Sequence, residues 1–188
     1  MAPDVPVLPA DGGKRDFFVS VPDDFARLRT AMGNPPEYHE VWFSALGLHA
    51  EIYVGPNRDI AKWEMNTDGS IDRHSVNFPA GPYDCARQPF MVDDATLARL
   101  PQLVQDAPRH TGGLDNPKLQ TVTIHRNLGQ FWRCTDVQIQ VNFESDCGAA
   151  YKGDDGYNYY DCPTRDVFYD TSGKFLWTTT DPHTRQAF

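Results

Sequence analysis

The chain has 188 residues, of which 40% are hydrophobic and 12% aromatic, and it carries 26 acidic against 17 basic side chains. This length and hydrophobic content are typical of one folded domain and exclude a disordered polymer. The formal net charge of −9 repels phosphate backbones and anionic lipids, and no apolar run is long enough to span a membrane, so we expect neither a nucleic-acid partner nor a membrane span.

Residues 1–15 are rich in proline and contain glycine, which predicts an extended tail ahead of a single domain over residues 16–188. The tail lacks the continuous apolar run of a signal peptide. Segments of this composition often link a removed export signal to a folded domain. We therefore expect an extracytoplasmic protein, secreted or periplasmic, whose signal peptide is not in this chain.

The first predicted helix lies in "SVPDDFARLRTAMGNPP". Pro22 suits a first helical turn, and Gly33 with the two prolines after it ends the helix. Phe25, Leu28 and Met32 fall at helical spacing, which predicts that one face packs against the rest of the domain.

Strands are predicted next. Apolar residues alternate with polar ones from Leu48 to Val54, after a Gly47 that indicates a turn or bulge. The segment 59–76 predicts a hairpin around the turn Asn-Thr-Asp-Gly, with Ala61, Trp63 and Met65 on one face. Residues 77–87 predict a loop.

A second helical region is predicted in "VDDATLARLPQLVQDAPRHTGG". Either Asp93 or Asp94 can cap it, and Pro101 is expected to kink it or split it into two short helices. The residues expected to form its apolar face are Leu97, Leu100 and Val104.

The strongest strand pattern is "DVQIQVNF", residues 136–143, where a core face alternates with a polar face that we expect to be solvated. "LQTVTIHR" predicts its antiparallel neighbour, and "DVFYDTSGKFLWTTT" a hairpin that turns at residues 170–173. This hairpin resembles "KWEMNTDGSI", a likeness that we interpret as generic. The predicted fold class is α+β, a single domain with an antiparallel sheet of about six to eight strands and two short helical segments.

The four cysteines include no CxxC pair, so their spacing argues against structural zinc. Two of them flank a polar, glycine-rich loop, which favours disulfides over reduced buried thiols. The pairing closest in sequence is Cys147 with Cys162 and Cys85 with Cys134.

No P-loop, GxSxG, GxGxxG or histidine metal motif is present, and the acidic loop lacks calcium-loop spacing, so we expect no cofactor and no metal. His39-Glu40 and His49-Glu51 would converge if their segments formed a hairpin, which would permit a metal or acid–base site. The favoured interpretation is that these are polar residues on solvated strand faces.

The loop "CGAAYKGDDGYNYYDC" has the composition of a binding loop, because tyrosine provides contact area at little entropy cost. A disulfide across the loop would limit what must be ordered on binding. A structural loop whose tyrosines cover the sheet is the alternative. The residues predicted to bind a partner are Tyr151, Tyr157, Tyr159, Tyr160, Asp154 and Asp155.

The C-terminal "LWTTTDPHTRQAF" resembles the last strand of small microbial ribonucleases, where a histidine follows a Thr-Thr-Asp stretch. The resemblance covers about a dozen residues and implies that His183 is a general acid with a strand glutamate as base. Pro182 is inserted before that histidine, and the family's glutamate and arginine have no evident counterpart here.

The leading hypothesis is a small exported protein that binds a protein partner, for example as an inhibitor or immunity-type protein. Its acidic charge suits a basic partner. Two alternatives remain: a secreted hydrolase such as a ribonuclease-like enzyme using His183, and a carbohydrate-binding module using the tyrosines and Trp132. The oligomeric state is left open.

Overall fold

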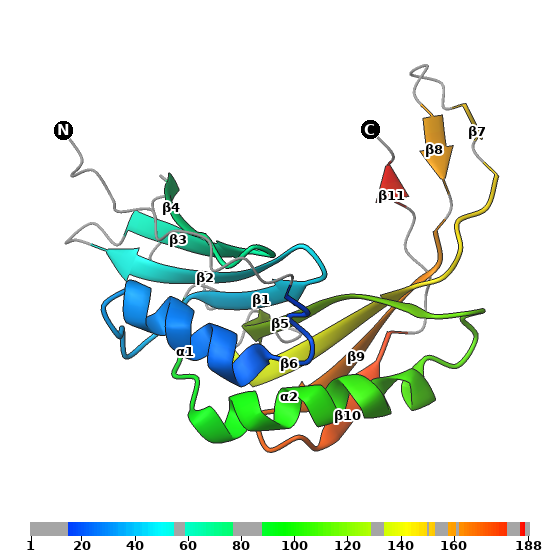
Figure 1. Cartoon of the computed structure of the whole chain (residues 1–188). Helices are drawn as coiled ribbons and strands as arrows, with labels where there is room; N and C mark the ends of the chain where they lie inside the picture. Colours follow the sequence, from blue (N-terminus) through cyan, green and yellow to red (C-terminus); the bar gives the residue numbers. More distant parts are fainter. Residues whose placement is uncertain are drawn as a thin grey trace.

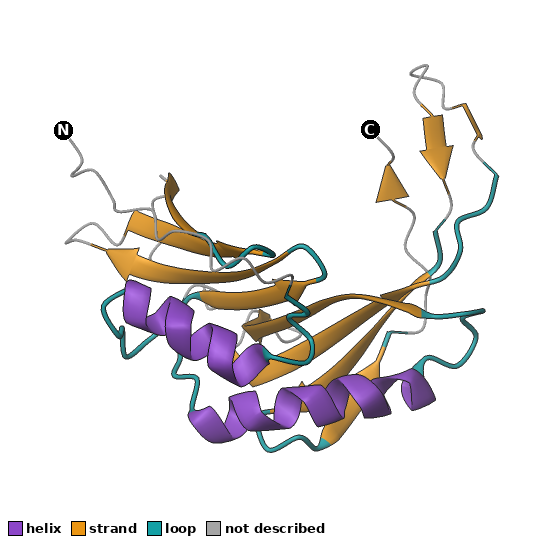
Figure 2. Ribbon diagram, viewed as in Figure 1, coloured by secondary structure: helices purple, strands orange, loops and turns teal. Residues whose placement is uncertain are grey.

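An antiparallel sheet of eight strands dominates the computed structural model, and two helices lie against one of its faces (Figures 1 and 2). The structure describes residues 15–54, 59–76, 88–128, 134–149, 151–152, 158–160, 162–179 and 185–186. The predicted α+β class, strand number and pair of helices are confirmed. Nearly all of the predicted tail, residues 1–15, and the predicted loop 77–87 lie outside the described residues.

The helices and the strands of the main sheet follow the chain in a simple order. They are α1 (Val21–Ala31), β1 (Glu40–Ser44), β2 (Gly47–Val54), β3 (Asp59–Asn66), β4 (Ile71–Val76), α2 (Asp94–Asp106) with the 3-10 turn η2 (Ala107–His110), β5 (Lys118–Leu128), β6 (Cys134–Glu144), β9 (Thr164–Asp170) and β10 (Phe175–Thr178).

This order contains the same arrangement twice. The N-terminal half has α1 followed by the meander β1 to β4, and the C-terminal half has α2 followed by the meander β5, β6, β9 and β10. The sheet order is β10-β9-β6-β5-β1-β2-β3-β4, so the first strands of the two halves meet at the centre. They pair antiparallel, with Val41 opposite Ile124, which relates the halves by a local twofold axis perpendicular to the sheet.

The last hairpin of each half turns in the same way. The N–H of Gly69 donates to the carbonyl of Asn66 at 2.9 Å, and the N–H of Gly173 donates to the carbonyl of Asp170 at 3.0 Å. Both glycines have a positive φ, 81° and 87°, which side chains with a Cβ disfavour. The likeness between these two segments, interpreted as generic from sequence, therefore marks equivalent positions of the two halves.

The core lies between the helices and one face of the sheet. Phe25 and Leu28 of α1 are fully buried there, as predicted, and Phe43 of β1 is buried from the sheet side. Removing a side chain of this size from water stabilises the fold by about 1.5–3 kcal/mol. Both helices thus leave the opposite face of the sheet free of described helices (Figure 2).

Helix α2 begins as predicted and continues further than predicted. Asp93 is its N-cap, and its carboxylate accepts the backbone N–H of Thr96 at 2.6 Å. The helix runs through Pro101 without a break, so the predicted split is wrong. Proline removes one backbone donor, but burial of the apolar face on both sides of it outweighs that loss. Leu103 is buried on this face, whereas Val104 is only half-buried.

The polar face of β6 is less solvated than predicted. Asp136 is exposed and Gln138 and Gln140 are half-buried, but Asn142 is buried. Its side-chain amide donates to a carboxylate oxygen of Asp166 on β9 at 2.7 Å. A cross-strand hydrogen bond therefore satisfies the amide nitrogen that the sequence pattern would leave to water.

A hairpin extends beyond the sheet between β6 and β9 and is called here the stapled hairpin, residues 145–163. The disulfide Cys147–Cys162 closes its base, as predicted. Its strands β7 (Tyr151–Lys152) and β8 (Asn158–Tyr160) pair with each other, and β8 also pairs with β11 (Arg185–Gln186). These three strands form a separate sheet that projects away from the helices (Figure 1).

The second predicted disulfide stays a prediction. Cys134 begins β6, where it pairs with Leu128, but Cys85 lies outside the described residues. Among the helices that the structure describes, none has the length and apolar character to cross a lipid bilayer.

Candidate functional site on the helix-free face

Opposed side chains form one line across the helix-free face of the whole sheet. Each strand contributes one residue, and each residue lies directly opposite the next in the strand register. We call this line the transverse row. From β4 to β10 it consists of Asp72, Glu64, His49, Trp42, Thr123, Gln140, Phe168 and Trp177.

The row lies on the face away from the helices because its members alternate with core residues. Trp42 stands between Val41 and Phe43, which are both fully buried. Strand residues point alternately to opposite faces, so Trp42 and its opposed neighbours face the other way.

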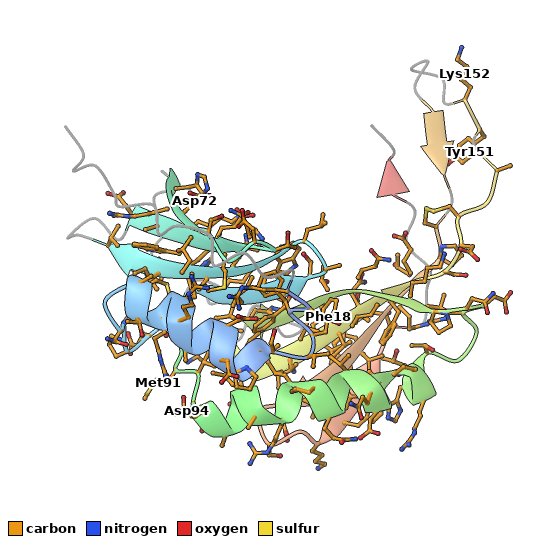
Figure 3. The ribbon with its side chains drawn as sticks, viewed as in Figure 1. Phe18, Asp72, Met91, Asp94, Tyr151 and Lys152 are labelled. Atoms are coloured by element: carbon orange, nitrogen blue, oxygen red, sulfur yellow. A yellow bond between two sulfur atoms is a disulfide. The ribbon has the colours of Figure 1, made fainter. Side chains whose placement is uncertain are left out.

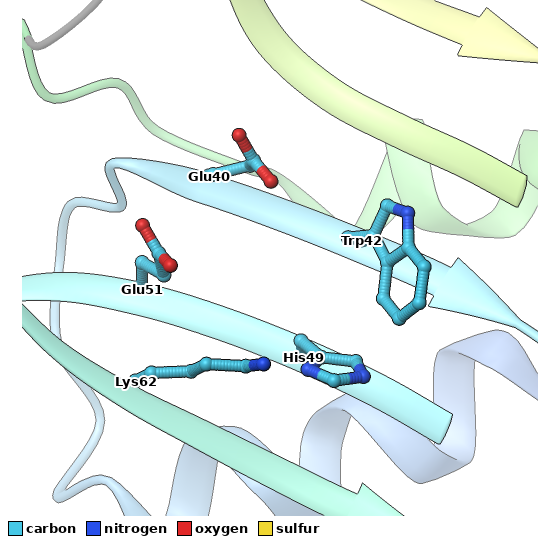
Figure 4. Close-up of a pocket in the computed structure, with 5 residues that line it drawn as sticks. All are labelled: Glu40, Trp42, His49, Glu51 and Lys62. Atoms are coloured by element: carbon cyan, nitrogen blue, oxygen red, sulfur yellow. The ribbon is translucent and has the colours of Figure 1, made fainter. Parts of the chain in front are cut away.

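A hollow of about 250 Å³ opens on this face in the N-terminal half, and we call it the Glu40 hollow (Figure 4). Because β1 and β2 form a hairpin, the His39-Glu40 and His49-Glu51 segments converge, which was the condition for a site there. Figure 4 shows the Glu40 and Glu51 carboxylates side by side, with the Trp42 and His49 rings further along the strands. Its lining residues are Glu40, Trp42, His49, Glu51 and Lys62.

Most charged groups around the hollow are paired. The Nδ1 atom of His39 lies 2.8 Å from a carboxylate oxygen of Glu51. Glu64, next to the hollow on β3, lies 3.7 Å from the Lys62 amine and 3.5 Å from Nε2 of His49. None of these contacts involves Glu40, the other carboxylate that lines the hollow.

Glu40 has no hydrogen-bond or ion-pair partner among the described residues. Burial raises the pKa of its carboxyl, and the negative charge of Glu51 opposite raises it further. His39 and Lys62 act in the other direction but do not outweigh these effects. The wall of the hollow therefore holds a half-buried carboxyl group that has no hydrogen-bond or ion-pair partner among the described residues.

His49 is held neutral at ordinary pH. Burial lowers the pKa of its imidazole to about 4, although the nearby Glu64 carboxylate opposes this. Its ring meets the Trp42 ring edge to face, with centroids 4.3 Å apart, and its Nδ1 atom is buried without a hydrogen-bond partner. The two rings form a neutral aromatic wall beside the carboxylates.

The C-terminal end of the transverse row is aromatic. The rings of Phe168 and Trp177 stack with centroids 3.8 Å apart at an angle of 13°. Phe168 is buried, whereas Trp177, on the edge strand β10, is 41% exposed. The exposed part of this stack is therefore the Trp177 side chain, at the edge of the sheet.

The potential metal-ligand atoms of the described residues around the hollow are too far apart to bind one ion together. Among the described residues, donor atoms of three His, Cys, Asp or Glu side chains come within metal-binding distance of one another only at Glu144, Cys147 and Cys162. The two sulfur atoms there are joined in the disulfide. The described residues around the hollow therefore do not include three side chains placed to bind one metal ion.

The partner-binding residues predicted from sequence belong to the stapled hairpin, not to the transverse row. Tyr151 is 46% exposed and lies near the tip of the hairpin with Lys152 (Figure 3). Tyr159 lies opposite Tyr151 in the register, and Tyr160 opposite Arg185, but only their backbones are described. The predicted residues outside the described parts are Asp154, Asp155, Tyr157, Trp132 and His183.

The sequence patterns did not indicate that Trp42, Phe168 and Trp177 lie in one row on the same face. Each was visible as an aromatic residue in a strand, but their alignment follows from the pairing of strands far apart in the sequence. The alternation of apolar and polar residues along a strand indicates which face of the sheet each side chain occupies. It does not indicate which strands are neighbours.

Comparisons of the chain with models of known protein families, with curated proteins and with solved structures found no match. The geometry of the face is therefore the basis for a functional conclusion.

Proposed function

We propose that this protein acts by binding, and that its partner is a basic protein that docks on the helix-free face of the sheet. The observation that carries this proposal is the transverse row. It spans eight strands, and it combines acidic residues at one end with an aromatic stack at the other, in which the Trp177 ring is exposed. An inhibitor or immunity-type role is the form of binding that fits such a face.

Charge supports a basic partner. The net charge is −9. Among the described residues, the N-terminal end of the face bears the carboxylates of Glu40, Glu51, Glu64 and Asp72 and the amine of Lys62. Complementary charge accelerates encounter and selects partners more than it adds affinity. The aromatic stack supplies the apolar contact that binding energy requires, since tryptophan is enriched at interface positions of large effect.

The stapled hairpin supports the same proposal as a second contact. The disulfide fixes its base, so less chain must be ordered on binding. The disulfide also supports export of the protein from the cytoplasm, because disulfides persist in oxidising compartments. The exported location is part of this proposal.

The test is capture by the immobilised protein from an extracellular extract, with two matched variants. Thr123→Arg places a large cation in the centre of the row, and Gln105→Arg places the same group on the exposed side of α2. We expect Thr123→Arg to reduce capture of basic proteins at least about tenfold and Gln105→Arg to leave it unchanged. Equal capture by both variants would refute the proposal.

A hydrolase is the second candidate, at residues other than His183. Glu40 and Glu51 are opposed on neighbouring strands, and the raised pKa of Glu40 suits a general acid. Turnover of model glycosides and esters that Glu40→Gln abolishes would establish this function. Absence of turnover by the unaltered protein would dismiss it.

A further inference from the structure

We propose that the Glu40 hollow is an anchor site for one arginine side chain of the partner, whose guanidinium binds between the carboxylates of Glu40 and Glu51. This inference rests on the proposed function and names the group that the face recognises. It follows from the charges, the walls and the size of the hollow.

One of the two carboxylates that line the hollow lacks a cationic partner in the described part of the chain. The Lys62 amine is 3.7 Å from Glu64, which lies outside the lining, and the imidazole of His39 holds Glu51 at 2.8 Å. Glu40 has no such partner among the described residues. A guanidinium placed between the two carboxylates would balance Glu40 and would leave the His39 contact in place.

The walls favour arginine over lysine. A guanidinium is planar, donates several parallel hydrogen bonds and packs its face against aromatic rings, whereas an ammonium is a strongly hydrated point charge. The Trp42 and His49 rings line the hollow beside the carboxylates (Figure 4). Because His49 is neutral, it does not repel an incoming cation.

The size of the hollow agrees with a side chain. Its volume of about 250 Å³ lies below the about 300–1,000 Å³ typical of pockets for drug-sized ligands. It is also open, which a group presented by another protein surface requires.

Binding is expected to depend on pH in one direction. A bound guanidinium favours the charged form of Glu40, so binding lowers the pKa of that carboxyl and strengthens as pH rises through it. The charged and titratable groups near Glu40 are Glu51 and His49 on β2, Lys62 on β3, His39 before β1, and His125 on β5, which follows the Ile124 that pairs with Val41.

The experiment titrates the full chain with a blocked Gly-Arg-Gly peptide and with its citrulline analogue, which keeps the shape and removes the charge. We expect the arginine peptide to shift the NMR signals of the Trp42 indole and of the Glu40 and Glu51 carboxyls. The citrulline peptide should leave them unchanged. Glu40→Gln should weaken binding at least about tenfold, which corresponds to roughly 1.4 kcal/mol.

The matched control is Glu37→Gln, which removes the same charge from an exposed residue near the start of β1. It should change the affinity by less than about twofold, as expected of an exposed charge. Equal effects of Glu37→Gln and Glu40→Gln, or equal binding of both peptides, would overturn the anchor site.

Failure of this inference is distinguishable from failure of the proposed function. If the peptides do not bind at the hollow but Thr123→Arg still reduces capture at least about tenfold, the face binds its partner without an arginine anchor. If Thr123→Arg leaves capture intact, the proposed function itself falls.

Discussion

The two halves of the sheet share their architecture and differ on the helix-free face. Each half is a helix followed by a four-stranded meander that ends in the same glycine turn. On that face the N-terminal half presents acidic residues around a hollow, and the C-terminal half presents Phe168 stacked on Trp177. The shared features are those that build a core, and the differing features are those that can select a partner.

The stapled hairpin is the second difference between the halves. It is inserted between β6 and β9, whereas the equivalent strands β2 and β3 are joined by the short segment 55–58. The insertion thus adds chain to the C-terminal half, while β6 and β9 remain neighbours in the sheet as β2 and β3 are.

The largest expected effect tests whether the halves are equivalent in stability. Leu28 of α1 and Leu100 of α2 are both fully buried. Replacing either by alanine should lower the free energy of unfolding by about 2–5 kcal/mol, because a cavity replaces the side chain. Denaturant titration should show a single transition for both variants. Two separate transitions would mean that the halves are independent units.

The next prediction concerns the disulfide Cys147–Cys162, which lies in the C-terminal half and has no counterpart among the described residues of the N-terminal half. Replacing Cys147 and Cys162 together by serine should lower the free energy of unfolding by about 3 kcal/mol, since the bond closes a loop with a sequence separation of 15 residues. Thermal unfolding measures this effect at about 2–4 °C per kcal/mol for a chain of this length. An unchanged midpoint would mean that the hairpin is uncoupled from the sheet.

The two glycine turns allow the sharpest comparison of the halves. Gly69→Ala and Gly173→Ala should each cost about 1–2 kcal/mol, because a Cβ disfavours the left-handed conformation of both residues. Gly112→Ala is the control, since no atom lies near its added Cβ. Costs that differ by more than about 1 kcal/mol between the turns would break the equivalence inferred from their shared hydrogen bonds.

A smaller effect is expected from His49, on the helix-free face of the N-terminal half. The folded imidazole takes up a proton near pH 4, whereas the unfolded one does so near its ordinary value of about 6.5. The unfolded state therefore binds more protons between these values, and stability falls as pH decreases from about 6.5 towards 4. His49→Gln should flatten this fall, as measured by denaturant titration at several pH values.

The smallest effect is expected from Glu40 and has the opposite sign. Because its pKa is raised in the folded state, the stability that its protonated form contributes is present in acid and is lost as pH rises. Glu40→Gln should therefore be more stable than the unaltered protein at pH 7, with the difference vanishing below about pH 4. Lower stability of the variant at pH 7 would show that the carboxylate has a favourable partner.

The fold was largely predictable because local patterns determine it. The apolar stripe of α1, the Asp93 cap and the alternation in β6 each correspond to an observed element. Of the two outcomes expected at Pro101, a kink or a split, the split is wrong because the burial of Leu97 and Leu100 before it and of Leu103 after it holds α2 together. Tertiary packing can outweigh a local preference, and a local pattern does not contain that information.

The candidate site was predictable only in part. The sequence indicated that Glu40 and Glu51 would meet if a hairpin formed, because that pairing is local. It did not indicate that Trp42 and Phe168 would share a row, because β1 and β9 are connected through β5 and β6. Likewise, Cys147 and Cys162 were paired correctly because they are close in sequence.

Oxidative footprinting of the complex with the captured partner tests the central claim most directly. Trp177 at the aromatic end of the row and Met91 on the helix side are both accessible, with exposed fractions of 41% and 72% (Figure 3 labels Met91). A partner docked on the helix-free face should protect Trp177 from hydroxyl radicals and leave the oxidation of Met91 unchanged. Protection of Met91 with full oxidation of Trp177 would contradict the account.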